Sequence, residues 1–308
     1  MAVMAVLVIA ASGFAQSACP SSLVADVPPN DFIGEKGTGG SLLKIAVASN
    51  YYCPAVDMVH YFLQSASSGT NLMVKVHHGS TGTLIAELES NSIAYDFLFT
   101  ADEISQTFVN NINFANYTNS NVLEEEVAAF LYAKGVPSFF GYKADGITNV
   151  GKLIVGLGSA DNFVVDEYGE DLADMDYEVN SMAEAVAVAV TPAAPYGTAA
   201  AAIFSEFTSW PSISGPWNNI ATTYDKVGTA GVKSGVVSKA QICNNIKAGQ
   251  VSHVDFTGYT LNQEAVQITG NGQPLMDWIL GEMVEGENDT NSAWNDFLDN
   301  HCYGLLTP

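Results

Sequence analysis

Strand-like and helix-like segments alternate from residue 42 onward, and this alternation limits the possible fold more than any other feature. The run LLKIAVAS is apolar enough for a buried strand, and Pro54 then opens a segment with apolar residues at helical spacing. LMVKVHHGS followed by TGTLIAELES repeats this order, as does YDFLFTA followed by a helix starting near Asp102. The short joints between these units predict a mostly parallel sheet with helices on its faces.

A second α/β unit is predicted in the rest of the chain, which at 308 residues and 48% hydrophobic content can form two compact lobes. FLYAKGVPSFFGY and GKLIVGL are typical of strands, and residues 161–179 of an acidic surface insertion. AVAVAVTPAAPYGTAAAAIFSEF predicts a strand, a turn and an alanine-rich helix. Residues 238–249 then predict a helix, VSHVDFTGY a strand and SAWNDFLDNHCYGLL a terminal amphipathic helix.

The charged residues are unbalanced, with a formal net charge of −23 and ten basic residues that are all lysines. Such a chain repels nucleic acid and anionic membrane surfaces, and we exclude nucleic acid as a partner. Without arginine, no guanidinium can hold a carboxylate or phosphate through two parallel hydrogen bonds. Any bound anion must therefore be held mainly by neutral donors.

The N-terminal segment MAVMAVLVIAASGFAQ is apolar, too short to span a bilayer and followed by small residues, which predicts a signal peptide over residues 1–17. Residues 18–40 contain Pro28, Pro29 and a glycine-rich run, and are expected to be a leader or linker. The four cysteines of an exported protein allow two disulfides with three possible pairings. Alternatively, Cys19 is lipidated in a degenerate lipoprotein motif, which leaves one cysteine unpaired.

Polar residues follow three of the predicted strands, at Ser49-Asn50, Gly79-Ser80-Thr81 and Thr100-Ala101-Asp102. Each loop alone is explained by ordinary helix capping, which Ser, Thr and Asp favour. Because the carboxyl ends of parallel strands meet at one sheet edge, the three loops together predict a ligand site there.

Several motifs, in this order, resemble the periplasmic molybdate-binding proteins, class II solute-binding proteins that serve ABC importers. The segments that carry the resemblance are VASNYYCP, VHHGSTGTLIAEL, YDFLFTADE, FLYAKG, VDEYGEDL and AVAVTPAAPYGTAA. The resemblance implies a two-lobed fold, with lobe 1 formed by residues 41–122 plus 258–308 and lobe 2 by residues 123–257. It further implies a periplasmic or otherwise extracytoplasmic monomer that binds molybdate or tungstate for an ABC importer, is not an enzyme and needs no cofactor.

The resemblance also places an oxyanion between the lobes. Ser49, Asn50 and Ser80 would donate from lobe 1, and the ligand-binding groups of lobe 2 would be Pro195, Tyr196, Ser238 and Lys239, with Thr257 as an additional hydroxyl donor. Lys239 stands where the family has an aliphatic residue, and the spacing between Trp217 and Gln241 is longer than the family pattern. Sulfate or another tetrahedral anion therefore stays open as the ligand.

Residues of the chain bear on three other kinds of site: a cysteine nucleophile, a metal centre and a pair of carboxylates. Cys53 precedes Pro54 at a helix start, where a thiol pKa is lowered, so a cysteine-nucleophile enzyme using Asp102 or Asp57 is the alternative by class. A metal site is not expected, since His77 and His78 are adjacent on a strand and point to opposite faces. Glu124, Glu125 and Glu126 are consecutive and predict a solvated helix start instead of a paired-carboxylate site.

Overall fold

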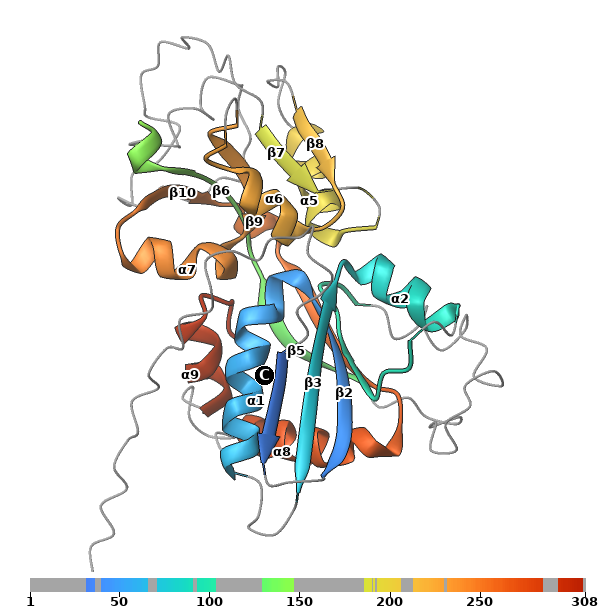
Figure 1. The fold of residues 1–308 in the computed structure, drawn as a ribbon. Helices are drawn as coiled ribbons and strands as arrows, with labels where there is room; N and C mark the ends of the chain where they lie inside the picture. Colours follow the sequence, from blue (N-terminus) through green and yellow to red (C-terminus); the bar gives the residue numbers. More distant parts are fainter. Residues whose placement is uncertain are drawn as a thin grey trace, which may run out of the picture.

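The chain forms two lobes, one above the other, each built around its own sheet with helices against it (Figure 1). The computed structural model describes residues 32–36, 40–65, 71–90, 93–103, 129–146, 186–189, 191, 193–205, 213–229, 232–284 and 293–306. The first lobe holds a six-stranded sheet of order β1-β3-β2-β4-β11-β5, and the second a five-stranded sheet of order β10-β6-β9-β7-β8.

The elements of the first lobe are β1 (Phe32–Lys36), β2 (Ser41–Ala48), the 3-10 turn η1 (Ser49–Tyr51), α1 (Tyr52–Ser65), β3 (Leu72–Gly79), α2 (Thr81–Glu89), β4 (Phe97–Phe99), β5 (Ala129–Gly135), β11 (Leu261–Gln267), η6 (Gly270–Gly272), α8 (Gln273–Val284) and α9 (Ala293–Asn300). The elements of the second lobe are β6 (Pro137–Tyr142), η3 (Lys143–Asp145), β7 (Val186–Ala189), α5 (Pro195–Ser205), β8 (Ile213–Trp217), α6 (Ile220–Lys226), β9 (Ser234–Ser238), α7 (Lys239–Lys247) and β10 (Val251–Asp255); η5 (Thr257–Tyr259) connects the lobes.

Each lobe has its own apolar core. In the first lobe, β2 supplies residues to both faces of the sheet: Ile45 and Val47 pack with α1, α8 and α9, whereas Ala46 packs with α2. This division follows from the two-residue repeat of a strand, which sends successive side chains to opposite faces. In the second lobe, Phe140 and Val237 pack with α5, α6 and α7. The alternation predicted from sequence therefore corresponds to sheets flanked by helices.

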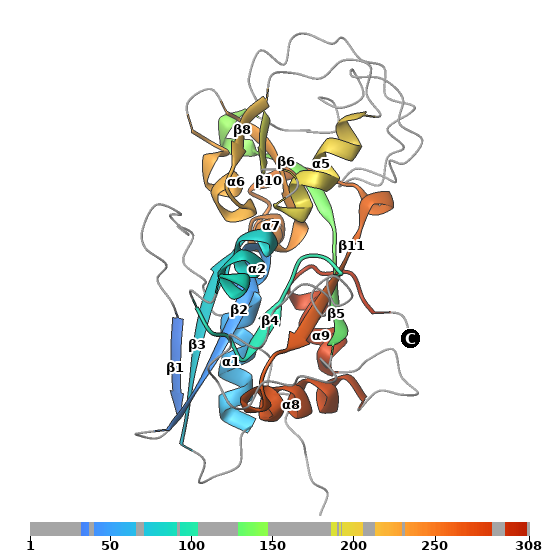
Figure 2. The ribbon, with the colours of Figure 1, turned by 90° about the vertical axis from the view of Figure 1, so that its right-hand side faces the viewer.

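The chain passes between the lobes at two described places (Figures 1 and 2). At the first, β5 pairs with β11 in one sheet and β6 pairs with β9 in the other, with only Val136 between β5 and β6. At the second, η5 joins β10 to β11. The first crossing corrects the expected boundary between residues 122 and 123, because β5 extends the first sheet before the chain leaves it.

Two further expectations from sequence require correction. Part of the segment expected to be a linker, Phe32–Lys36, forms edge strand β1, which pairs antiparallel with β3. An edge strand is held by main-chain hydrogen bonds, so its sequence needs no apolar alternation. Both sheets are mixed instead of mostly parallel: β2 runs parallel to β3 and β4, but β11 runs antiparallel to β4 and β5.

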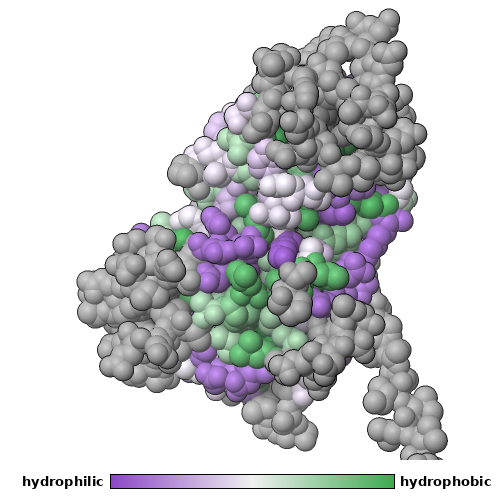
Figure 3. Space-filling model, turned by 180° about the vertical axis from the view of Figure 1, so that it is seen from behind, coloured by the Kyte–Doolittle hydropathy of each residue, from purple (hydrophilic) through white to green (hydrophobic). Residues whose placement is uncertain are grey.

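Several predicted segments lie outside the described residues. They are the signal peptide at residues 1–17 with Cys19, the helix after Asp102 together with Glu124–Glu126, the strand GKLIVGL and the acidic insertion at residues 161–179. Within the part that is described, no helix combines the length and apolar character needed to cross a bilayer. Seen from behind, hydrophilic residues gather near the junction of the lobes, above an apolar area on the first lobe (Figure 3).

Candidate functional site

Ends of elements from both lobes meet at the junction. Ser49 and Asn50 form the start of η1, directly after β2, and η1 packs against α6 and α7 of the second lobe. From that lobe, Tyr196 lies in the first turn of α5, next to Pro195, and Ser238 caps the N-terminus of α7. All five of these residues are buried. The structure thus brings residues from distant parts of the predicted site to one interface between the lobes.

Ser80 is the N-cap residue of α2, at another point of contact between the lobes. Its Oγ accepts a hydrogen bond from the Thr83 N–H at 3.2 Å, as an N-cap serine does. The N–H of Gly82, in the first turn, donates to the carbonyl oxygen of Ala193 in the second lobe at 3.0 Å. A Cβ on Gly82 would lie 3.0 Å from the Ala193 backbone, so glycine permits this close approach.

A chain of buried side-chain hydrogen bonds joins the two lobes through Gln263 of β11. Its Oε1 accepts from Asn50 Nδ2 at 3.2 Å and from the Tyr132 hydroxyl at 2.8 Å, both in the first lobe. Its Nε2 donates to the Tyr196 hydroxyl at 2.9 Å, and Tyr196 in turn donates to Ser238 Oγ at 2.9 Å. We call Asn50, Tyr132, Gln263, Tyr196 and Ser238 the interlobe relay.

Tyrosines support the relay from the first lobe. The Tyr303 hydroxyl accepts from Asn50 Nδ2 at 3.0 Å and donates to the Asn50 carbonyl oxygen at 3.0 Å. Tyr51 packs edge-on against Tyr132, with ring centroids 4.6 Å apart. Burial raises the pKa of Tyr132, Tyr196 and Tyr303 above the usual tyrosine value, so these phenols keep their protons. The relay is therefore neutral.

Ser49 has a different neighbour. Its Oγ lies 3.5 Å from Nδ1 of His78, at the limit of a hydrogen bond, and the His78 ring packs on Tyr52 with centroids 4.5 Å apart. His77, the next residue along β3, lies 3.4 Å from the Glu87 carboxylate of α2. The two histidines thus have separate partners. Among the described residues, no group of three or more potential metal ligands is found.

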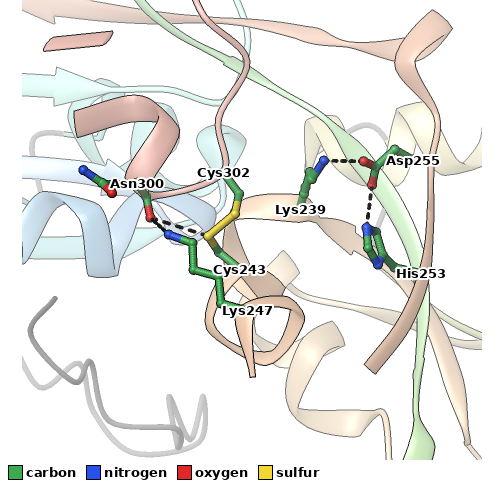
Figure 4. The surroundings of a disulfide bond; sticks show 7 residues. All are labelled: Lys239, Cys243, Lys247, His253, Asp255, Asn300 and Cys302. Carbon is green, nitrogen blue, oxygen red and sulfur yellow. Dashed lines mark hydrogen bonds and ion pairs between the residues drawn. A yellow bond between two sulfur atoms is a disulfide. The ribbon is translucent and has the colours of Figure 1, made fainter. Parts of the chain in front are cut away.

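Like Ser49, Ser80 and Pro195, the residues Lys239 and Thr257 implied by the resemblance are not members of the relay. Lys239 Nζ forms an ion pair with the Asp255 carboxylate (Figure 4). The backbone N–H of Lys239 donates to the Val136 carbonyl oxygen at 2.8 Å. Asp255 also accepts from Ser138 at 2.6 Å. Thr257 is exposed in η5. Since Asp255 offsets the charge of Lys239, the junction gains no uncompensated cation from it.

The cysteines exclude the enzyme alternative that was based on Cys53. This residue is disulfide-bonded, so it has no thiolate to act as a nucleophile. Of its proposed partners, Asp102 is exposed and Asp57 lies 3.5 Å from His301. A second disulfide joins Cys243 of α7 to Cys302, just after α9, and so links the two lobes covalently (Figure 4). The sequence left this pairing open.

Gln263, Tyr132 and Tyr303 were missed by the sequence analysis. Gln263 and Tyr132 lie inside strands, where a polar residue carries no signal of its own, and Tyr303 lies in the short C-terminal segment beyond α9. Tyr132 does fall within FLYAKG, one of the segments that carry the family resemblance, but its hydroxyl contact to Gln263 spans 131 positions in sequence. Only the folded chain reveals that pair.

The comparison with known proteins gives a clear result for the fold. No family model and no curated protein matches the sequence. Among solved structures, a domain described as the substrate-binding domain of a molybdenum ABC transporter from Clostridium difficile is similar, with a TM-score of 0.50, 10% identity, and 86% of this chain and 99% of that chain covered. The sulfate-binding protein SubI from Mycobacterium tuberculosis is similar with a TM-score of 0.54 and 9% identity, over 87% of this chain and 88% of that one.

These similarities and the two-sheet topology define the class of fold. The chain has the two-lobed α/β architecture of periplasmic binding proteins, with a buried polar relay at the junction of the lobes. The two-lobed architecture predicted from sequence is thereby confirmed.

Proposed function

We propose that this protein is an extracytoplasmic solute-binding protein that captures a tetrahedral oxyanion, molybdate or tungstate, between its lobes for an ABC importer. The observation that carries the proposal is the interlobe relay, because it gathers neutral hydroxyl and amide groups from both lobes without a cationic side chain. Ser49 and Ser80, which follow the neighbouring ends of β2 and β3, add two more hydroxyl groups.

Neutral donors can hold a dianion when enough of them converge. Backbone N–H groups in the first turn of a helix have no partner within the helix, and each helix start carries the equivalent of about half a positive charge. Burial strengthens these interactions because water no longer screens them. The chain has no arginine and its Lys239 is paired with Asp255, so the donors that we assign to the anion are neutral groups.

The similar structures support an oxyanion and leave two candidates. One is described as serving a molybdenum transporter and the other binds sulfate. Both anions are tetrahedral dianions, and sulfate is smaller. The second candidate function is therefore sulfate capture, which the likeness to the sulfate-binding protein favours.

Calorimetric titration of the purified protein with molybdate, tungstate, sulfate and phosphate tests the proposal. We expect saturable one-to-one binding of molybdate and tungstate, weaker binding of sulfate and the weakest binding of phosphate. Tighter binding of sulfate than of molybdate would favour the second candidate. Failure to bind any of the four anions would overturn the proposed function.

Replacing Ser49 or Ser80 with alanine should weaken binding of the preferred anion by about 1–3 kcal/mol each, because each change removes one hydroxyl donor to a charged ligand. Calorimetry gives the affinity, and thermal unfolding reports the separate loss of the Ser80 cap on α2. Ser90→Ala is a matched control, since Ser90 lies at the far end of α2 and is exposed. Unchanged affinity in both variants would show that the site lies elsewhere.

A further inference from the structure

Each hydrogen bond of the relay has a fixed donor and a fixed acceptor, and the amide of Gln263 determines which group is which. We call this order of donors and acceptors the direction of the relay. An amide side chain has one end that only accepts hydrogen bonds and one end that only donates them. In Gln263 the accepting end faces Asn50 and Tyr132, and the donating end faces the Tyr196 hydroxyl. The amide cannot rotate alone by half a turn, because its NH2 would then face the NH2 group of Asn50.

The orientation of the Gln263 amide also determines whether Ser238 accepts or donates a hydrogen bond towards Tyr196. The Tyr196 oxygen receives the Gln263 Nε2 proton at 2.9 Å, so its own single proton goes to Ser238 Oγ, also at 2.9 Å. Ser238 Oγ is thus an acceptor towards Tyr196, and its own proton must point elsewhere. Ser238 is 0% exposed, and no acceptor for that proton is found in the described part of the chain. A buried hydroxyl is left as a donor at the start of α7.

We infer that Gln263 is a positioning residue of the anion site: it fixes the direction of the relay so that Ser238 presents a proton, which makes the site select oxyanions that carry no proton. This inference rests on the proposed function. An ion such as molybdate or sulfate accepts the Ser238 proton, whereas the protonated oxygen of hydrogen phosphate would meet another donor and lose a hydrogen bond.

The remaining groups of the relay fit this role. Burial raises the pKa of Tyr196, so the phenol stays protonated and passes on the direction set by the amide. The N–H of Ser238 donates to Gln241 Oε1 at 3.2 Å, which holds the residue at the start of α7. The position of Ser238 is therefore fixed independently of Gln263, and only its proton depends on the amide.

The substitution Gln263→Glu tests the inference because a carboxylate has nearly the shape of the amide but only accepts hydrogen bonds. Asn50 and Tyr132 keep their acceptor, but Tyr196 now donates to residue 263, and Ser238 donates to Tyr196. Ser238 then offers the ligand a lone pair instead of a proton. The new charge lowers the affinity for every dianion, so the measured quantity is the ratio of the affinity for hydrogen phosphate to that for molybdate or sulfate.

We expect this ratio to rise about tenfold to a hundredfold over wild type, the effect of exchanging a favourable for an unfavourable hydrogen bond to a charged ligand. Because a buried glutamate can have a pKa of about 8–9, the titrations run from about pH 6 to about pH 9.5. Protonated glutamate again has one donor and one acceptor, so the ratio should return towards wild type at the lower end. The affinity ratio of the variant is divided by the ratio of wild type at the same pH, which removes the effect of the ligand's own titration.

The matched control is Gln267→Glu. Gln267 is also in β11 and 1% exposed, but it bonds to Thr269 and Gln273, about 13 Å further along the strand. This variant introduces the same buried charge away from the relay, and its ratio should equal that of wild type. In a Tyr196→Phe background, which cuts the relay, Gln263→Glu should no longer change the ratio.

The outcomes separate the two proposals. If wild type binds none of the oxyanions, the proposed function fails and this inference fails with it. If wild type binds them and Gln263→Glu leaves the ratio unchanged throughout the pH range, or changes it equally with and without Tyr196, the role of Gln263 is overturned and the proposed function stands.

Discussion

Replacing Gly135 with alanine is expected to lower the free energy of unfolding by about 2–6 kcal/mol and to weaken anion binding sharply. Gly135 ends β5 at the crossing between the lobes, and an added Cβ would collide with the Tyr196 hydroxyl and with Gln263 Nε2. Overpacking a core typically costs about 1–3 kcal/mol, and leaving a buried polar group unpaired costs a similar amount. The two obstructing atoms are the donor and the acceptor of one relay hydrogen bond. The added Cβ therefore both overpacks the core and breaks this bond.

Urea denaturation monitored by tryptophan fluorescence measures this loss, and calorimetry measures the binding. The control is Gly281→Ala in α8, where a Cβ would meet nothing within 4 Å. That variant should gain up to about 1 kcal/mol, since alanine favours the helix over glycine. If Gly135→Ala were as stable as wild type, the placement of the Tyr196 and Gln263 side chains against Gly135 would be incorrect.

Local patterns were sufficient to predict most of the regular elements. The apolar repeat locates α1 and α2, the run LLKIAVAS locates β2, and the Pro-Tyr-Gly turn locates the start of α5. Strand β1 was missed because its pairing with β3 is made through the backbone. The crossing at Val136 was missed because β5 and β6 read as one continuous strand in sequence and differ only in their neighbours.

The residues at the junction of the lobes also differ in whether the sequence alone can identify them. Asn50, Tyr196 and Ser238, three members of the relay, stand at strand ends and helix starts, which a sequence marks. Gln263 does not, and comparison with Gln267 shows why the sequence does not identify it. Both are glutamines of β11 and both are buried, yet one joins the lobes and the other bonds locally to Thr269. What distinguishes them is their tertiary neighbours.

The disulfide pairing was equally out of reach, since four cysteines allow three connectivities. The structure joins Cys243 of the second lobe to Cys302, whose neighbour Tyr303 belongs to the core of the first lobe. Beside this bond, Lys247 Nζ donates to the carbonyl oxygen of Asn300 at 2.7 Å. A bond between lobes has two effects: it restricts the unfolded chain, and it restricts separation of the lobes.

Removing this bond by the double substitution Cys243→Ala and Cys302→Ala should therefore lower the free energy of unfolding by about 4 kcal/mol, from the entropy of closing a loop with a sequence separation of 59. Urea denaturation measures the loss. The double variant is preferred to a reductant because Cys53 is also disulfide-bonded and would be reduced as well.

The same variant should widen the lobe separation of the ligand-free protein, which small-angle X-ray scattering would detect as a larger radius of gyration, and should speed the release of a bound oxyanion. The hydrogen bond of Lys247 offers a matched comparison, since Lys247→Met removes a noncovalent link at the same place. An exposed contact of this kind is worth less than about 1 kcal/mol, so Lys247→Met should change neither quantity measurably. If the double variant loses stability but keeps the radius and release rate of wild type, the bond acts only on the unfolded chain, and closure depends on the relay instead.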